Sequence, residues 1–116
     1  MGLEANLVYL EDEIINLQTR ASAIRDYLKS NPSSSIYRRR IAGRIYYYKK
    51  YRIGKRSISE YLGNEKFDVK TASLQVKGEN EKNRRARIRL SQMRKEIAVL
   101  KRQARIVRKV VSYARP

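Results

Sequence analysis

Basic and aromatic side chains are concentrated in one short stretch of the chain, GRIYYYKKYRIGKRSISEYLG, at residues 43–63. Successive side chains of an extended strand point to opposite faces of a sheet. The side chains that this alternation places together on one face of the central strand are Tyr46, Tyr48, Lys50 and Arg52. Lysine and arginine bind phosphate, and tyrosine rings stack on bases or donate hydrogen bonds to phosphate. The stretch therefore predicts contact with a nucleic acid, although aromatic cross-strand pairs also stabilise a sheet without any ligand.

The full set of residues expected to contact nucleic acid includes the strands, one turn and the second helix. These residues are Tyr37, Arg39, Arg44, Tyr46, Tyr48, Lys50, Arg52, Lys55, Arg56, Arg84 and Arg85. Tyr37, Arg39 and Tyr61 share a face with the central tyrosines only in one strand register, which the sequence leaves open. The other face is more apolar, and we expect it to pack on the protein itself. The residues expected beneath it are Phe67, Val69 and Leu74.

The charge balance of the chain points to the same class of partner. The 116 residues contain 28 Lys and Arg against 11 Asp and Glu, a formal net charge of +17. Such a charge attracts polyanions over about one Debye length, roughly 8 Å at physiological salt. A basic surface that is merely solvated is the alternative interpretation.

Residues suited to catalysis or metal binding are scarce. The chain has no cysteine and no histidine, which excludes disulfides, thiolate metal sites and histidine acid–base chemistry. The acids Glu11, Asp12 and Glu13 are consecutive on an expected helix and point in different directions, so they do not converge on a metal ion. The sequence contains no phosphate-binding glycine loop. We expect a non-enzymatic protein with no catalytic residue, metal site or cofactor.

No apolar run approaches the ~20 residues that a membrane span requires. The N-terminal segment is acidic and resembles no export signal. We therefore expect no membrane partner and a cytoplasmic location.

Two apolar seams flank the basic stretch, each with the alternating spacing of four and three that defines a heptad repeat. The first seam is Leu3, Leu7, Leu10, Ile14, Leu17, Ala21, Ile24 and Leu28. The second seam is Ala86, Leu90, Met93, Ile97, Leu100, Ala104, Val107 and Val111. Antiparallel pairing satisfies every layer, and it also places Glu4 near Arg108 and Glu11 near Lys101. The rival arrangement is self-association through the same seam.

The sequence thus predicts an α+β fold in which a three-stranded antiparallel sheet is inserted into a long antiparallel helical coiled-coil hairpin. We expect one domain over residues 1–116, with a helix at 3–30, the sheet at 35–63 and a helix at 68–114. Asp68 is the expected N-cap of the second helix. That helix is either continuous or broken near 78–83, where Gly78 costs about 1 kcal/mol relative to alanine.

The segment YYYKKYRIGKRSISEYLG, followed by DVKTA at the start of the second helix, resembles a module of mobile elements. Over residues 35–75 it is similar to the arm-type DNA-binding domain of phage and transposon integrases and to the N-terminal hairpin of insertion-sequence transposases. The shared features are a tyrosine-rich strand, a Gly-Lys turn and a terminal Leu-Gly before a helix with an early alanine. The resemblance implies that the sheet enters the major groove of DNA. The residues that would face DNA are Tyr46, Tyr48, Lys50, Arg52, Lys55 and Arg56.

The chain departs from both families in its long heptad helices, and its 116 residues contain no catalytic domain. The resemblance therefore implies a phage or mobile-element context and not recombination. Two other functions also fit the sequence. One is a small inhibitor, such as an anti-CRISPR protein, or an adaptor of a nucleic-acid machine, with a protein partner such as a CRISPR nuclease. The other is a structural coiled-coil assembly protein. The sequence does not distinguish DNA from RNA, or a monomeric helical hairpin from a homodimer through the heptad seam.

Overall fold

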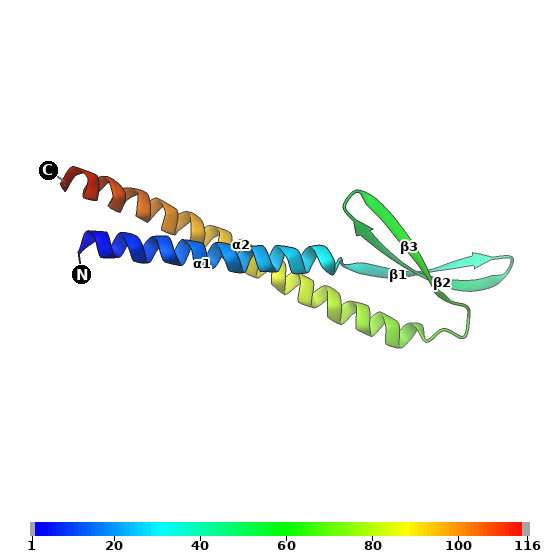
Figure 1. Ribbon diagram of the computed structural model, residues 1–116. Coiled ribbons are helices and arrows are strands. Elements are labelled where there is room, and N and C mark those ends of the chain that lie inside the picture. Colours follow the sequence, from blue (N-terminus) through cyan, green and yellow to red (C-terminus); the bar gives the residue numbers. More distant parts are fainter. Residues whose placement is uncertain (1, 115–116) are drawn as a thin grey trace. The chain divides into compact units, whose positions relative to one another are not determined.

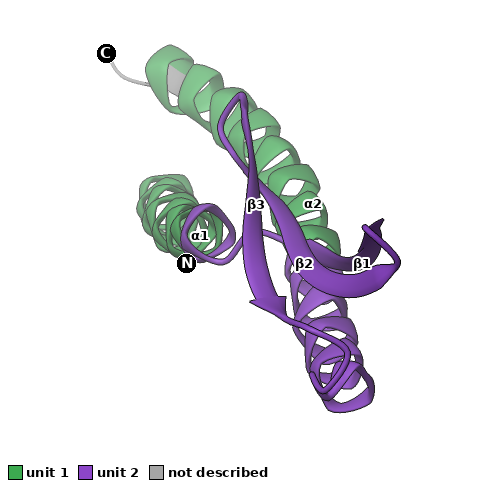
Figure 2. Ribbon diagram, turned by 90° about the vertical axis from the view of Figure 1, so that its right-hand side faces the viewer, with its two compact units in different colours: residues 1–26, 87–116 green, residues 27–86 purple. Residues whose placement is uncertain are grey.

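The computed structural model describes residues 2–114 of the chain. Its elements are α1 (Leu3–Ser30), β1 (Ser34–Ile41), β2 (Arg44–Ile53), β3 (Arg56–Gly63) and α2 (Val69–Ala114) (Figure 1). The two long helices and the three-stranded antiparallel sheet confirm the predicted α+β fold. The chain divides into two compact units (Figure 2). Unit 1 is Met1–Asp26 with Arg87–Pro116, and unit 2 is Tyr27–Ala86.

Unit 1 is a pair of antiparallel helical segments, one from α1 and one from α2 (Figure 1). Its buried apolar residues are Ile14, Leu17, Ala21, Leu90, Met93, Ala104 and Val111. All of them belong to the two predicted heptad seams. Ala21 and Ala104 are each only 1 % exposed, because their small side chains lie entirely beneath their neighbours. Leu3, the first predicted seam residue, is 45 % exposed, since it lies in the first turn of α1.

An ion pair between the two helices of unit 1 differs from the predicted one. Glu11 Oε1 accepts a hydrogen bond from Arg108 Nη2 at 3.1 Å, whereas the heptad positions predicted Lys101 as the partner of Glu11. Long helical side chains lean toward the N-terminus of their own helix. On antiparallel helices this makes Glu11 and Arg108 lean toward each other, while Glu11 and Lys101 lean apart. The partner of Glu11 is therefore one heptad farther along α2.

The sheet of unit 2 has β2 at its centre, in the order β1-β2-β3. Both of its turns contain two residues. Ala42 and Gly43 have φ angles of 51° and 79°, as in a type I′ turn, whereas in the second turn Gly54 alone has a positive φ, of 60°, as in type II′. These turns match the twist of the strands, so they set the register of both hairpins.

The start of α2 is capped as the sequence predicts. The Thr71 N–H donates a hydrogen bond to Asp68 Oδ1 at 3.2 Å, and the Thr71 hydroxyl donates to Oδ2 at 2.7 Å. These two hydrogen bonds, the hydroxyl's first, hold the pKa of Asp68 below its ordinary value. From Val69 the helix continues through Gly78 to Ala114 without interruption. Of the two forms that the sequence allows, the structure has the continuous helix.

Two asparagines of α2 hold the segment that leads into β1. Asn80 exchanges two hydrogen bonds with the backbone of Ser34: the Ser34 N–H donates to Oδ1 at 3.0 Å, and Nδ2 donates to the carbonyl at 2.8 Å. Asn83 Nδ2 donates to the Asn31 carbonyl at 2.7 Å, and the Asn83 side chain is almost fully buried. The carboxyl-terminal end of α1, the start of β1 and the first part of α2 are therefore joined within unit 2. No helix among residues 2–114 combines the length and the apolar character needed to cross a membrane.

Candidate nucleic-acid interface

The strand register decides which side chains share a face of the sheet. Tyr37 lies opposite Tyr48 and Arg39 opposite Tyr46 in the pairing of β1 with β2, and Tyr61 on β3 lies opposite Tyr48. Directly opposed residues of an antiparallel pair point to the same side. The register thus places Tyr37, Arg39 and Tyr61 with the central tyrosines. We call this surface the tyrosine face. Its tyrosine and basic residues are Tyr37, Arg39, Arg44, Tyr46, Tyr48, Lys50, Arg52 and Tyr61, and the same register adds Ser35, Ile41, Ser57 and Ser59.

The four tyrosine rings of this face form one continuous cluster across all three strands. Tyr37 and Tyr48 stack with their centroids 5.5 Å apart and their planes inclined by 18°. Tyr61 meets Tyr48 edge-on at 5.7 Å and Tyr46 at 6.3 Å. Such aromatic pairs contribute about 0.5–1.5 kcal/mol each beyond the area that they bury. Tyr48 is engaged by rings from both neighbouring strands, so its ring has little room to stack on a base.

Unpaired positive charge surrounds the ring cluster. The exposed basic side chains of the tyrosine face are Arg39, Arg44, Lys50 and Arg52. None of the four forms an ion pair with any of residues 2–114. The strands contain one carboxylate, Glu60, and it lies opposite Lys49 on the other face. The tyrosine face therefore carries cations and hydroxyl groups but no acid.

The opposite face of the sheet packs on the protein, as expected for Phe67 but not for Leu74. The rings of Tyr47 and Phe67 are 5.9 Å apart. A Cβ atom on Gly63 would lie 2.9 Å from the Phe67 Cβ, so the close approach of Phe67 requires glycine at this position. Leu74 is 70 % exposed, because it lies on a side of α2 that the sheet does not cover. Val69 is half-buried.

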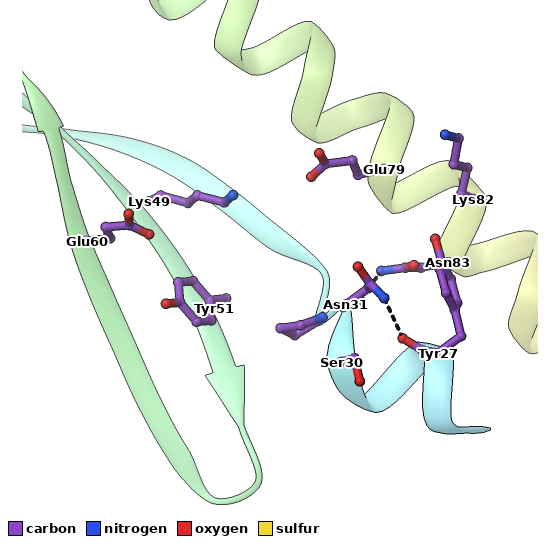
Figure 3. A pocket seen from close by; sticks show the side chains of 10 residues that line it. Tyr27, Ser30, Asn31, Lys49, Tyr51, Glu60, Glu79, Lys82 and Asn83 are labelled. Atoms are coloured by element: carbon purple, nitrogen blue, oxygen red, sulfur yellow. Dashed lines mark hydrogen bonds between the residues drawn. The ribbon is translucent and has the colours of Figure 1, made fainter. Parts of the chain in front are cut away.

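Figure 3 shows a polar hollow of 420 Å³ against this opposite face. Lys49, Tyr51 and Glu60 line it from the strands, and Glu79 and Lys82 line it from α2. The face that contains Lys49 and Tyr51 is therefore the one directed toward α2 within unit 2. The tyrosine face is directed away from this helical segment, which leaves it open to a ligand.

Four predicted contact residues lie outside the tyrosine face. Lys55 is in the β2–β3 turn, at the end of the sheet next to Arg52. Arg56 lies opposite Ile53 and therefore points to the other face. Arg84 and Arg85 are on α2, where Arg84 lines a hollow together with Ser34, Ser35 and Ile36 of β1.

Arg84 and Arg85 are both tied to one carboxylate. Arg84 donates two hydrogen bonds of 3.1 Å to Glu81, and Arg85 Nε lies 3.5 Å from Glu81 Oε1. The hydrogen bond from Arg84 is the main reason why the pKa of Glu81 lies below its ordinary value. These arginines are exposed, but part of their charge is already compensated within the helix.

Comparison with protein-family models, curated proteins and solved structures finds no significant match to this chain. Among the described residues there is also no group of three or more histidine, cysteine, aspartate or glutamate side chains that could hold a metal ion. The geometry and charge of the tyrosine face are therefore the basis for assigning a function.

Proposed function

We propose that this protein binds nucleic acid through the tyrosine face and catalyses no reaction on it. One observation carries the proposal: the ring cluster spans three strands on a face that has four unpaired cations and no carboxylate. Sheet stability accounts for the rings but not for the charge. Basic residues also protect the edges of sheets from aggregation. However, Arg44, Lys50 and Arg52 lie on β2, which is the central strand and has no free edge.

The arrangement of the rings favours contact with the phosphate backbone over stacking on bases. A stacking platform needs an aromatic face that is free to receive a base, whereas Tyr48 is engaged from both sides. The hydroxyls of Tyr46, Tyr48 and Tyr61 can instead donate hydrogen bonds to phosphate oxygens beside the lysine and arginines. We therefore propose a double-stranded ligand. The resemblance to the integrase and transposase modules supports duplex DNA and a phage or mobile-element context.

Fluorescence anisotropy with labelled duplex DNA, duplex RNA and single-stranded DNA, over a series of salt concentrations, tests this proposal. The protein is first freed of bound nucleic acid by nuclease treatment. We expect duplex DNA to bind more tightly than single-stranded DNA. Its log K should fall by about 0.9 per unit of log salt for each phosphate neutralised. Tight binding that is insensitive to salt would contradict the proposal. If the protein binds none of the three ligands, an acidic protein partner is favoured, as for an inhibitor.

Two neighbouring arginines of β1 provide a matched pair of variants. Arg39 is on the tyrosine face, and Arg40, opposite Ile45, is on the other face. Both side chains are exposed. Arg39→Ala should weaken binding to every duplex sequence and reduce the salt slope by about one phosphate contact. Arg40→Ala should leave both unchanged, and equal effects of the two variants would indicate nonspecific attraction by net charge.

A further inference from the structure

In unit 1, α2 carries a second row of apolar residues outside the buried seam. We call it the outer row, and it consists of Val99, Ile106, Val110 and Tyr113, which are 44 %, 58 %, 44 % and 90 % exposed. Val99, Ile106 and Tyr113 are seven residues apart, and Val110 falls between the last two. This is the spacing of side chains that pack against another helix. Within unit 1, α1 occupies the seam and leaves the outer row uncovered.

The outer row continues onto α1 through Tyr9. This side chain is 65 % exposed, and it lines a hollow of 350 Å³ together with Ile106 and the uncharged Asn6 and Gln103. Isolated exposed apolar residues need no explanation, but a contiguous patch is typical of an interaction site. The residues that line this hollow are all uncharged, whereas 34 % of the residues of this chain are charged.

The two margins of this face carry opposite charges. Asp12 follows Tyr9 by three residues on α1, and residues three or four apart are neighbours on a helix surface. On α2, Arg102 precedes Ile106 by four residues and Lys109 follows it by three. None of Asp12, Arg102 and Lys109 forms an ion pair with any of the described residues. A partner that covers the face must therefore offer a basic margin to α1 and an acidic margin to α2.

We propose that the partner is a second copy of this chain, related by a two-fold axis parallel to the helices of unit 1. Such an axis packs α1 of each copy against α2 of the other, so that the acidic margin of each meets the basic margin of its partner. Asp12 then lies beside Arg102 of the second copy. A two-fold axis perpendicular to the helices, in the plane of the contact, would instead place α2 against α2 and oppose like charges. The interface is self-complementary, as two-fold symmetry requires. It differs from the predicted homodimer because the heptad seam is already used within the chain.

Sedimentation velocity on the nuclease-treated full chain, over a range of concentrations, tests the proposal. We expect a dimer, and Ile106→Glu combined with Val110→Glu should reduce the molar mass twofold. Ile15→Glu is the control: Ile15 is 61 % exposed, but it lines a hollow with Arg105 and Arg108 on another side of the helix pair. This variant should remain dimeric, and circular dichroism should show equal helix content in all variants. A wild-type monomer at every concentration, or equal dissociation by Ile15→Glu, would overturn the proposal.

A charge exchange tests the symmetry of the dimer at low salt, where exposed charges are least screened. Asp12→Arg and Arg102→Asp should each raise the dissociation constant of the dimer, because each places like charges together. The double variant restores an opposite pair and should recover most of the wild-type affinity. A double variant that dissociates as readily as the two singles would exclude the parallel two-fold arrangement.

Discussion

The ring of Tyr37 on β1 stacks on the ring of Tyr48 on β2, with centroids 5.5 Å apart and planes inclined by 18°. Tyr61 meets Tyr48 from β3, and the Tyr37 hydroxyl donates a hydrogen bond to Ser59 Oγ at 3.1 Å. These side chains join the three strands on the outer surface of the sheet. The ring of Tyr48 thus stabilises the sheet, while its hydroxyl is the group that we propose to bind phosphate.

Tyr48→Phe separates these two contributions, because it keeps the ring and removes the hydroxyl. We expect the free energy of unfolding to change by less than about 0.5 kcal/mol, as is usual for a surface substitution. The affinity for duplex should fall about tenfold or more, since a hydrogen bond to a charged group is worth roughly 1.5–3 kcal/mol. Anisotropy titration and urea denaturation measure the two effects.

The control for Tyr48→Phe is Tyr51→Phe, on the opposite face of the same strand. Tyr51 lines the polar hollow and should not contact the ligand. Its affinity should match that of the wild type. If Tyr48→Phe also binds duplex normally, the ring cluster serves the sheet alone and the hydroxyl has no role in binding.

Asn83 is the most buried polar side chain of unit 2, at 2 % exposure. Asn83→Ala should lower the free energy of unfolding by about 1–3 kcal/mol, because the Asn31 carbonyl loses its donor in a partly buried site. Gln75→Ala is the matched control, since Gln75 is exposed on the same helix. Urea denaturation of both variants tests this expectation. A loss no larger than that of Gln75→Ala would show that water replaces the hydrogen bond at little cost.

Much of the tyrosine face follows from the sequence, because strand alternation and turn length determine it. A two-residue turn at Gly54 and Lys55 pairs residues at equal distances on either side, which brings Tyr61 opposite Tyr48. The same rule places Arg56 opposite Ile53. The resemblance implies that Arg56 faces DNA, whereas this pairing directs it to the other face, and Tyr61, whose register the sequence leaves open, lies on the tyrosine face.

The contacts of the helices were less predictable. The heptad pattern identified the buried seams, but the Glu11–Arg108 pair depends on the direction in which each side chain leans. Asn80 and Asn83 lie in the segment near 78–83 where the sequence allows a break of α2, and they bind the backbone of residues 31–34. A sequence shows that such residues are polar, but their partners are about fifty positions away and depend on the folded path of the chain.

The cap of α2 predicts a pH effect. Asp68 has a lowered pKa in the folded protein, so its carboxylate stabilises the fold fully above the ordinary pKa of 3.8. This contribution is lost as the pH falls through the lowered pKa that Asp68 has in the folded protein. Below pH 3.8 the first turn of α2 should therefore lose protection in the wild type, measured as its hydrogen-exchange rate relative to that of an unstructured peptide at the same pH. Asp68→Asn keeps a capping side chain but cannot titrate, so its exchange should lack this acid-dependent step. The same step in both proteins would assign it to another group.

Substitution of Gly78 tests whether α2 is continuous in solution. Glycine inside a helix costs about 0.5–1 kcal/mol relative to alanine, and a Cβ atom at this position meets no other atom within 4 Å. Gly78→Ala should therefore raise the free energy of unfolding by about that amount. Gly43→Ala is the opposite control, because its φ of 79° disfavours any side chain and the substitution should destabilise the first hairpin. Urea denaturation reports both changes. If Gly78→Ala leaves the stability unchanged, alanine has no formed helix to favour at residue 78, and the interrupted form of α2 that the sequence also allows would be the one present in solution.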